Sequence, residues 1–175
     1  MPDAALCDSI EIVTGYRPGI IGRCLELQAR TYADHAGFGR VFEAGRANDI
    51  ADFFHRGPPE RSQFWSALKG GVVVGTVAID SEGLGANVAQ VRWFVVDDST
   101  RGTGLGRRLL RAALDFCDRS GFAETHLWTF AGLAAARHLY ETERFALKAE
   151  VETAEWGPVV LKQHFVRAGV LAAAG

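Results

Sequence analysis

Residues 91–106 read VRWFVVDDSTRGTGLG, a run of apolar residues that passes directly into a turn containing three glycines. Gly102, Gly104 and Gly106 can adopt positive φ angles, and they let the backbone approach a ligand closely. The next residues follow helical spacing, and Ser120 and Gly121 form a typical helix end. The apolar face of this predicted helix consists of Leu105, Leu109, Ala112, Ala113 and Phe116. The pattern therefore predicts a strand, a glycine-rich loop and an amphipathic helix.

This loop has the properties of an anion site. The first N–H groups of a helix have no intrahelical partner and lie at its positive dipole end, which suits a pyrophosphate. Arg101, Arg107 and Arg108 add positive charge. A Walker loop is excluded because no Lys-Ser or Lys-Thr pair follows the glycines. A dinucleotide fingerprint is excluded because Arg107 or Leu109 stands where its third glycine is required.

The surrounding sequence predicts a mixed sheet. A strand over 88–96, the helix and a strand over 125–130 form a βαβ unit, which requires parallel pairing. Lys69, Gly70 and Gly71 predict a hairpin turn between two further strands. The other expected strands cover about 10–13, 63–68, 72–79, 146–153 and 159–166, and the other expected helices cover 20–35, 38–54 and 133–141. We expect one α/β (α+β) domain over 1–175, with six or seven strands flanked by helices.

Composition narrows the class of protein. With 48% hydrophobic and 23% charged residues among 175, the chain is typical of a globular domain. The net charge of −2 argues against a dedicated nucleic-acid partner. No run approaches the roughly 18 apolar residues of a membrane span, and residues 1–10 do not resemble a signal peptide. The three cysteines are far apart, so we expect no disulfide framework, no metal site and a cytoplasmic location.

A family resemblance rests on the loop and on a second motif. Arg101, Gly104 and Gly106 match the pattern R-x-x-G-x-G, and residues 136–141 (ARHLYE) with Phe145 resemble a second conserved block. Together they resemble the GNAT family of N-acetyltransferases over about 72–165. Three positions depart from the family pattern, namely Asp98 for Pro, Leu133 for Asn and Arg144 for Gly. Residues 91–94, 127–130 and 132–140 are also similar to the acetyltransferase half of MarR-type regulator–acetyltransferase fusions, without their winged-helix half.

The resemblance implies acetyl-CoA as co-substrate and a primary amine of a small molecule or peptide as acceptor (EC 2.3.1.-). A backbone N–H near Val95 or Val96 would hold the developing oxyanion. Tyr140 would be the general acid that protonates the leaving thiolate. The implied cofactor-binding residues are Phe94, Val95, Val96, Arg101, Gly102, Thr103, Gly104, Leu105, Gly106, Arg107, Leu133 and Ala136.

The acceptor and the general base stay open at this stage. By residue type alone, the base candidates are His35, Glu43, Glu82, His126 and Glu155, and a water relay past Gln90 is the alternative. The expected acceptor-binding residues are Arg92, Trp93, Trp128 and Phe38. Arg92 as a carboxylate clamp would favour an amino-acid-like acceptor.

Two wider questions also stay open. A non-catalytic acyl-CoA-binding sensor is the alternative to an enzyme. Residues 156–166 are the segment through which a homodimer would form, and the Arg-rich, Lys-poor usage suggests a bacterial source.

Overall fold

The computed structural model describes residues 9–57 and 59–170. Cys7 and the chain start, on which the signal-peptide expectation rests, lie outside the described residues. The elements are, in chain order, β1 (Ile10–Thr14), α1 (Ile20–Ala36), α2 (Arg40–His55), β2 (Gln63–Lys69), β3 (Val72–Asp80), β4 (Val88–Val96), the 3₁₀ turn η2 (Asp98–Thr100), α3 (Leu105–Arg119), β5 (Glu124–Phe130), α4 (Ala134–Thr142), β6 (Ala146–Thr153) and β7 (Val160–Ala168). The predicted helices and strands are confirmed to within a few residues at each end. The turn η2 was not predicted.

The strands form one sheet in the order β1-β2-β3-β4-β5-β7-β6. β4 and β5 pair parallel through the crossover helix α3, and the other neighbouring pairs are antiparallel. The predicted hairpin joins β2 to β3, with positive φ at both Gly70 and Gly71 as its tight turn requires. The expected mixed sheet with a parallel βαβ unit is therefore confirmed.

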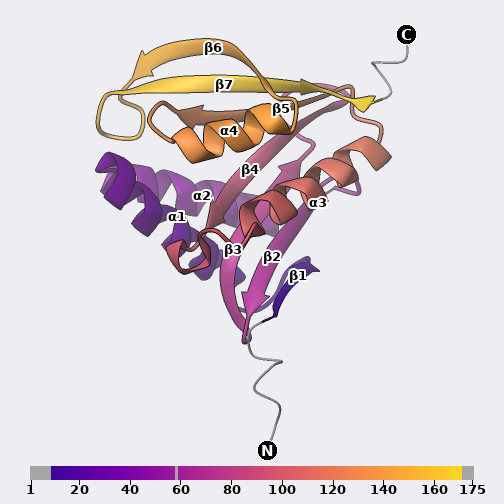
Figure 1. The fold of residues 1–175 in the computed structure, drawn as a ribbon, viewed down its shortest axis with the longest axis horizontal. Coiled ribbons are helices and arrows are strands. Elements are labelled where there is room, and N and C mark those ends of the chain that lie inside the picture. Colours follow the sequence, from indigo (N-terminus) through magenta and orange to yellow (C-terminus); the bar gives the residue numbers. More distant parts are fainter. Residues whose placement is uncertain (1–8, 58, 171–175) are drawn as a thin grey trace, which may run out of the picture.

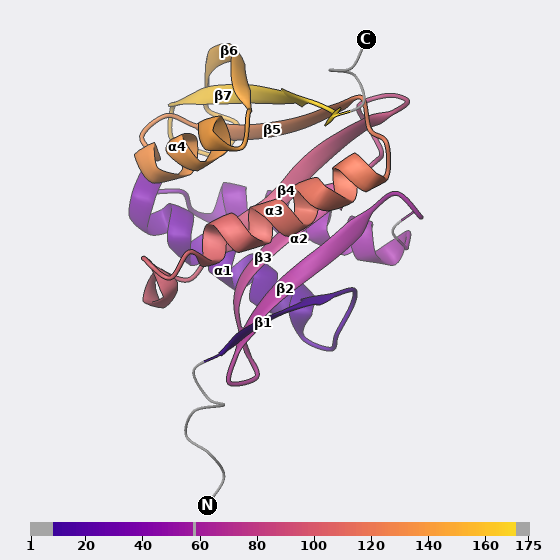
Figure 2. The same ribbon diagram turned by 45° about the vertical axis from the view of Figure 1, so that its right-hand side comes forward.

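Helices cover both faces of this sheet. Figures 1 and 2 show α3 crossing in front of β2–β4, with α1 and α2 behind them. The front cluster of buried side chains joins α3 and α4 to the strands, through residues such as Leu109, Leu114 and Tyr140. The rear cluster joins α1 and α2 to β2, β3 and β4, through residues such as Cys24 and Phe53. The amphipathic face predicted for α3 is the face that packs on the sheet.

β4 and β5 are paired over a short length. Their pairing runs from Val88 with Glu124 to Gln90 with His126. Beyond Gln90, β5 continues to pair with β7 on its other side. The sheet therefore opens between β4 and β5 toward the carboxyl ends of both strands, where ligands bind in open α/β sheets.

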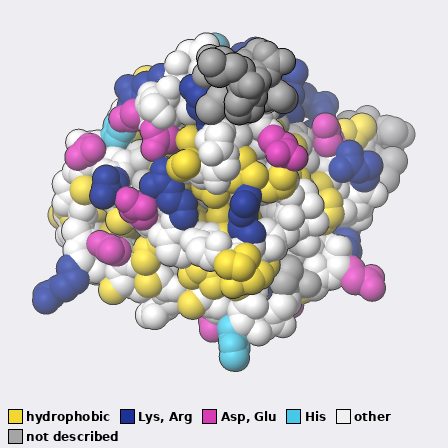
Figure 3. Space-filling model, turned by 90° about the horizontal axis from the view of Figure 1, so that it is seen from below, with side chains coloured by type: hydrophobic (Ala, Val, Ile, Leu, Met, Phe, Trp, Pro, Cys, Tyr) yellow, Lys and Arg dark blue, Asp and Glu magenta, His cyan; other side chains and the backbone are white. Residues whose placement is uncertain are grey.

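The surface carries charges of both signs. On the face seen in Figure 3, acidic and basic side chains alternate around an apolar centre. This mixture agrees with the small net charge of the chain. Among the described residues, no helix is long and apolar enough to cross a membrane.

A two-pronged ion pair anchors the end of α3 to β7. Both terminal nitrogens of Arg167 donate to Asp118, each at 2.8 Å. The Arg167 side chain is almost fully buried, with 5% exposed. These hydrogen bonds hold the pKa of Asp118 below its ordinary value. The pair fixes the crossover helix against the half of the sheet that lies beyond the opening.

We predict that Asp118→Asn lowers the free energy of unfolding by about 3 kcal/mol near neutral pH, because it leaves the buried Arg167 charge unpaired. The depressed pKa means that the pair stabilises the fold above the ordinary aspartate pKa of about 4. That contribution is lost as pH falls through the lowered pKa. Urea titrations at several pH values measure both effects. Asp115→Asn, on the exposed side of the same helix, is the control and should change little.

Candidate active site

A β-bulge in β4 shapes the opening. Ala78 of β3 pairs with Arg92, whereas Thr76 pairs with Val95, so β4 holds one extra residue there. Trp93 carries the irregularity, with φ 47°, which is rare for a bulky side chain. The Thr76 hydroxyl donates a 2.8 Å hydrogen bond to the Trp93 carbonyl oxygen. Buried contacts therefore hold the strained conformation in place.

The bulge changes which side chains face which helices. Before it, Val91 belongs to the front cluster beside α3. After it, Val95 belongs to the rear cluster, and Phe94 and Val96 pack against the front cluster. Arg92 and Trp93 both face α2, since Arg92 contacts Asp49 and Trp93 packs on Phe53. The bulge thus directs a guanidinium group and an indole to the rear side of the opening.

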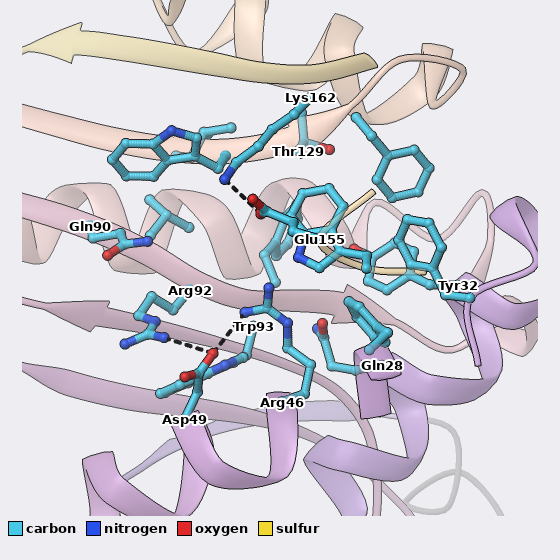
Figure 4. Close-up of a pocket in the computed structure, with 18 of the residues that line it drawn as sticks. Gln28, Tyr32, Arg46, Asp49, Gln90, Arg92, Trp93, Thr129, Glu155 and Lys162 are labelled. Carbon is cyan, nitrogen blue, oxygen red and sulfur yellow. Dashed lines mark hydrogen bonds and ion pairs between the residues drawn. The ribbon is translucent and has the colours of Figure 1, made fainter. Parts of the chain in front are cut away.

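Two cavities occupy the opening, one on each side. A polar cavity of about 250 Å³ lies between β4, β5, α1, α2 and the β6–β7 connection (Figure 4). An apolar cavity of about 400 Å³ lies between the end of β4, α1, the 98–101 turn, the start of α3, and α4. Tyr32, Phe94 and Tyr140 line both cavities. The two spaces therefore meet at these three residues, one of which is Tyr140.

The end of β4 presents free backbone groups to this opening. The Asp97 N–H bonds to the Val74 carbonyl of β3. Because backbone groups of alternate residues point to the same side of a strand, those of Val95 also face β3. Those of Phe94 and Val96 face the opening, where β5 has already diverged. Of the two positions expected to supply the oxyanion donor, Val96 has its backbone N–H on the side of the opening and Val95 has its own on the side of β3.

The glycine loop forms an uncapped helix start. Gly102 and Gly104 have φ near +76°, and a Cβ at either would meet no atom within 4 Å. No side chain caps α3, and its first turn holds no acidic residue. The loop is stabilised from its other side, because the Thr100 hydroxyl bonds to Asp97 and the Thr103 hydroxyl to Thr100. The uncapped N–H groups and open glycines fit a pyrophosphate.

The sequence-predicted cofactor residues divide into two groups. Those that line the apolar cavity are Phe94, Val95, Val96, Arg101, Gly106, Leu133 and Ala136. Those that belong to the loop and the first turn of α3 without lining it are Gly102, Thr103, Gly104, Leu105 and Arg107. Leu105 is buried against the sheet, so only its backbone can serve a ligand. Leu133, in place of the family's Asn, offers an apolar side chain.

Tyr140 lies at the junction of the cavities and is held by aromatic neighbours. Its ring centre is 6.2 Å from that of Phe94 and 5.9 Å from that of Phe165. Burial raises the pKa of Tyr140 well above its ordinary value, and Tyr32 adds to the shift. The phenol therefore keeps its proton at neutral and alkaline pH. This is the state that a proton donor requires.

All four expected acceptor-binding residues line the polar cavity. Phe38 belongs to an aromatic cluster with Phe42 and Phe130, and Trp128 stacks on the His164 ring at 4.3 Å. Arg92 is already held by two carboxylates, Asp80 at 3.2 Å and Asp49 at 3.3 Å.

The base candidates are scattered over the molecule. Glu155 lines the polar cavity, as does Gln90, whereas His35 lines the apolar cavity and bonds to the Thr31 carbonyl. Three candidates line neither cavity, namely Glu43, Glu82 and His126. The structure therefore separates Glu155 from the other acids that residue type alone suggested.

Several polar residues of the site were missed from the sequence. Gln28 comes from α1, Arg46 and Asp49 come from α2, and Lys162 comes from β7. The spacing of Arg46 and Asp49, three positions apart, does indicate a shared helix face. Nothing in the sequence shows that this face looks into the opening beside β4.

Comparison with known proteins gives a family and a fold. The sequence model of the acetyltransferase (GNAT) family matches residues 21–145. N-acetylaspartate synthetase of Danio rerio is 35% identical over 104 residues, which cover 59% of this chain and 36% of that protein. The synthetase of Xenopus tropicalis is 34% identical over 105 residues, which cover 60% of this chain and 38% of that protein. This chain thus spans a little over a third of the length of these relatives.

Solved structures share the fold. An acetyltransferase of the GNAT family from Staphylococcus aureus Mu50 superposes with a TM-score of 0.71 at 18% identity, covering 91% of this chain and 99% of that one. The yncA protein of Salmonella typhimurium, solved with its cofactor acetyl-CoA, gives 0.70 at 16% identity, covering 92% and 94%. At these identities the likeness shows the fold alone.

We predict that Thr76→Val lowers the free energy of unfolding by about 1–3 kcal/mol, because the Trp93 carbonyl loses a buried donor. Thr76→Ser retains the hydroxyl and should cost less. Guanidinium titrations followed by tryptophan fluorescence measure both variants. Equal losses would show that the hydroxyl does not hold the bulge.

Proposed function

Because the chain belongs to the GNAT acetyltransferase family, we propose that it transfers the acetyl group of acetyl-CoA to the primary amine of a small, amino-acid-like molecule. One observation carries the proposal: an apolar cavity and a polar cavity enter the opening from two sides and meet at Tyr140. A donor and an acceptor can thus approach one proton donor from different directions. Relatives named N-acetylaspartate synthetase support an amino acid as acceptor, since that name denotes an N-acetylated amino acid.

We propose that the donor binds along β4 and the glycine loop. Acetyl-CoA supplies an acyl group activated as a thioester. The backbone N–H groups of 102–107 would bind its pyrophosphate. The apolar cavity, with Leu133 and Ala136, would hold the pantetheine arm. The backbone groups of Phe94 and Val96 would orient the thioester carbonyl and stabilise its developing negative charge.

Side chains that line the polar cavity would carry out the two proton transfers of the reaction. Glu155, the base candidate that lines it, would take a proton from the acceptor amine before attack. Tyr140 would give its phenolic proton to the leaving sulfur, and the second proton that the amine nitrogen loses as the amide forms would restore the phenol. Each turnover would thus release one net proton, which Glu155 would pass to solvent. The described cysteines, Cys24 and Cys117, line neither cavity, and burial raises the pKa of each thiol to about 12. They therefore remain thiols, which favours direct attack by the amine.

We also propose that residues 1–175 act as a single N-acetyltransferase domain. The cytoplasmic location, the homodimer and the narrower resemblance to regulator fusions stay predictions from the sequence.

Release of CoA thiol from acetyl-CoA, measured across amino acids, polyamines and peptide N-termini, tests the activity directly. We expect release that depends on the acceptor amine. A protein whose melting temperature rises with acetyl-CoA but which acetylates none of these amines would contradict the enzyme. That outcome would point to an acyl-CoA-binding sensor.

We predict that Tyr140→Phe lowers kcat by roughly 10- to 10⁴-fold, because the leaving sulfur loses its proton donor. The Kd for acetyl-CoA should change little. Steady-state kinetics and isothermal titration separate the two quantities. Tyr32→Phe is the matched control, since Tyr32 also lines both cavities. If Tyr32→Phe abolished turnover and Tyr140→Phe did not, the roles would be reversed.

We predict that Gly106→Ala weakens acetyl-CoA binding roughly tenfold, the scale of one methyl group in a fitted pocket. A Cβ at Gly106 would lie 3.7 Å from Phe94 and 3.8 Å from Leu139, both of which line the apolar cavity. These are ordinary contacts, so the fold should keep or gain stability, as expected for Ala in a helix. Thermal melting with and without acetyl-CoA distinguishes lost binding from lost folding.

A further inference from the structure

We propose that Arg46 and Gln28 form a carboxylate-binding subsite that selects acceptors carrying a carboxylate close to the reacting amine. The inference rests on the proposed acetyl transfer and gives its acceptor a chemical class. It moves the clamp expected at Arg92 to a residue of the neighbouring helix.

An alternating chain of charges leads to Arg46. Glu82 pairs with Arg56, and Arg56 pairs with the buried Asp80 at 2.7 Å. Asp80 also pairs with Arg92, as described above. In this series of charges, the two acids Glu82 and Asp80 pair with the two guanidinium groups of Arg56 and Arg92. Arg92 is therefore already engaged in an ion pair within the protein.

Asp49 is the last acid of this chain, and it is shared. The same oxygen, Oδ2, accepts a hydrogen bond from Arg46 and forms an ion pair with Arg92, each at 3.3 Å. Arg46 is therefore the last cation of this series of charges, and among the described residues its ion-pair partner is an oxygen that it shares with Arg92. Figure 4 shows its guanidinium group extending into the polar cavity between Asp49 and Glu155. Arg46 is the cation of this cavity that is left to bind an anion.

The surroundings of Arg46 favour an incoming negative charge. Its side chain is 22% exposed, and its burial lowers the pKa of the guanidinium group; Arg92 adds to this lowering, whereas Asp49, Tyr32 and Glu155 oppose it. The remaining cation of the cavity, Lys162, is neutralised by Glu155 at 2.6 Å. Three cations line the cavity, and with the buried Asp80 three acids face them, so the cavity offers an anion hydrogen-bond donors rather than excess charge.

A second and independent observation points to the same ligand. The Gln28 side chain is buried, with 4% of the residue exposed, and its Nε2 has no hydrogen-bond partner among the described residues. Trp93 Nε1 is buried without a partner in the same way. Both residues line the polar cavity. Unpaired buried donors are costly, and an acceptor oxygen would satisfy them.

The geometry suits a planar anion of small size. The Arg46 guanidinium carbon lies 5.2 Å from the centre of the Phe42 ring and 6.0 Å from that of Trp156. These aromatic contacts orient the plane, and an arginine fork then matches the two oxygens of a carboxylate. The volume of about 250 Å³ is below the roughly 300–1,000 Å³ of sites for drug-sized ligands. An amino-acid-sized acceptor fits these limits.

The test compares acceptors with and without the carboxylate. Aspartate and its α-amide and β-amide are offered to the wild type, Arg46→Gln and Gln28→Met. We expect the wild type to lose roughly 10- to 100-fold in kcat/KM on the α-amide, which lacks the carboxylate next to the amine, the scale of a hydrogen bond to a charged group. In both variants that preference should vanish, while KM for acetyl-CoA stays unchanged. Arg30→Gln, at an exposed position of α1, is the control and should keep the preference.

Stability measurements separate a binding role from a structural one. Asp49 keeps Arg92 as its partner when Arg46 is removed, so Arg46→Gln should fold normally. Gln28→Met removes an unpaired buried donor, so its melting temperature should stay equal or rise while acceptor KM rises. A loss of stability in Gln28→Met would contradict the idea that Nε2 awaits a ligand.

Succinate binding, measured by thermal shift and by titration, tests the subsite without requiring turnover. Succinate should stabilise the wild type and Arg30→Gln, but not Arg46→Gln. If the wild type acetylates amines without preferring a carboxylate, the subsite is overturned and the acetyltransferase stands. If no amine is acetylated but succinate binds through Arg46, the proposed function fails and the subsite stands. If neither is observed, both are overturned.

Discussion

The site depends on the separation of β4 from β5 after three paired residues. A parallel pair that continued to the strand ends would close the sheet and leave no path for a ligand. β5 instead stays bonded to β7, and β4 stays bonded to β3 through the bulge at Trp93. Both strands thus satisfy their backbone groups on the outer side and expose them on the inner side. The opening is stable because each strand has another partner.

The bulge also gives the two sides of this opening different chemistry. An extra residue in β4 turns Arg92 and Trp93 toward α2 and leaves Phe94 facing α3 and α4. One side becomes a charged space with buried donors, and the other becomes an apolar channel that ends at the glycine loop. Tyr140 of α4 lies where they meet. A single backbone irregularity therefore separates the proposed acceptor and donor paths.

Local sequence signals account for most of the fold and for half of the site. The periodicity of 105–119, the paired glycines at 70 and 71, and the R-x-x-G-x-G loop each act through neighbours in the chain. The bulge was not predicted, because it reflects register between two strands and not a local preference of Trp93. Arg46 and Gln28 were missed for a similar reason. Their importance comes from α1 and α2 facing β4, which is a tertiary contact.

The unpaired donors of the polar cavity lower the stability of the free protein, and a bound ligand would satisfy them. A core designed for stability alone would place an apolar residue at 28, since a buried amide without a partner opposes folding. Arg46 likewise shares the Oδ2 atom of Asp49 with Arg92 instead of having a carboxylate of its own among the described ion pairs. Both groups are held in position before any ligand arrives, by Phe42 and Trp156 around the guanidinium group and by close packing around Gln28. Binding then requires little reordering of side chains, so more of the interaction energy remains available for affinity. The unpaired amide of Gln28 and the shared carboxylate of Arg46 lower the stability of the free protein, and the same two groups would give the acceptor site its selectivity.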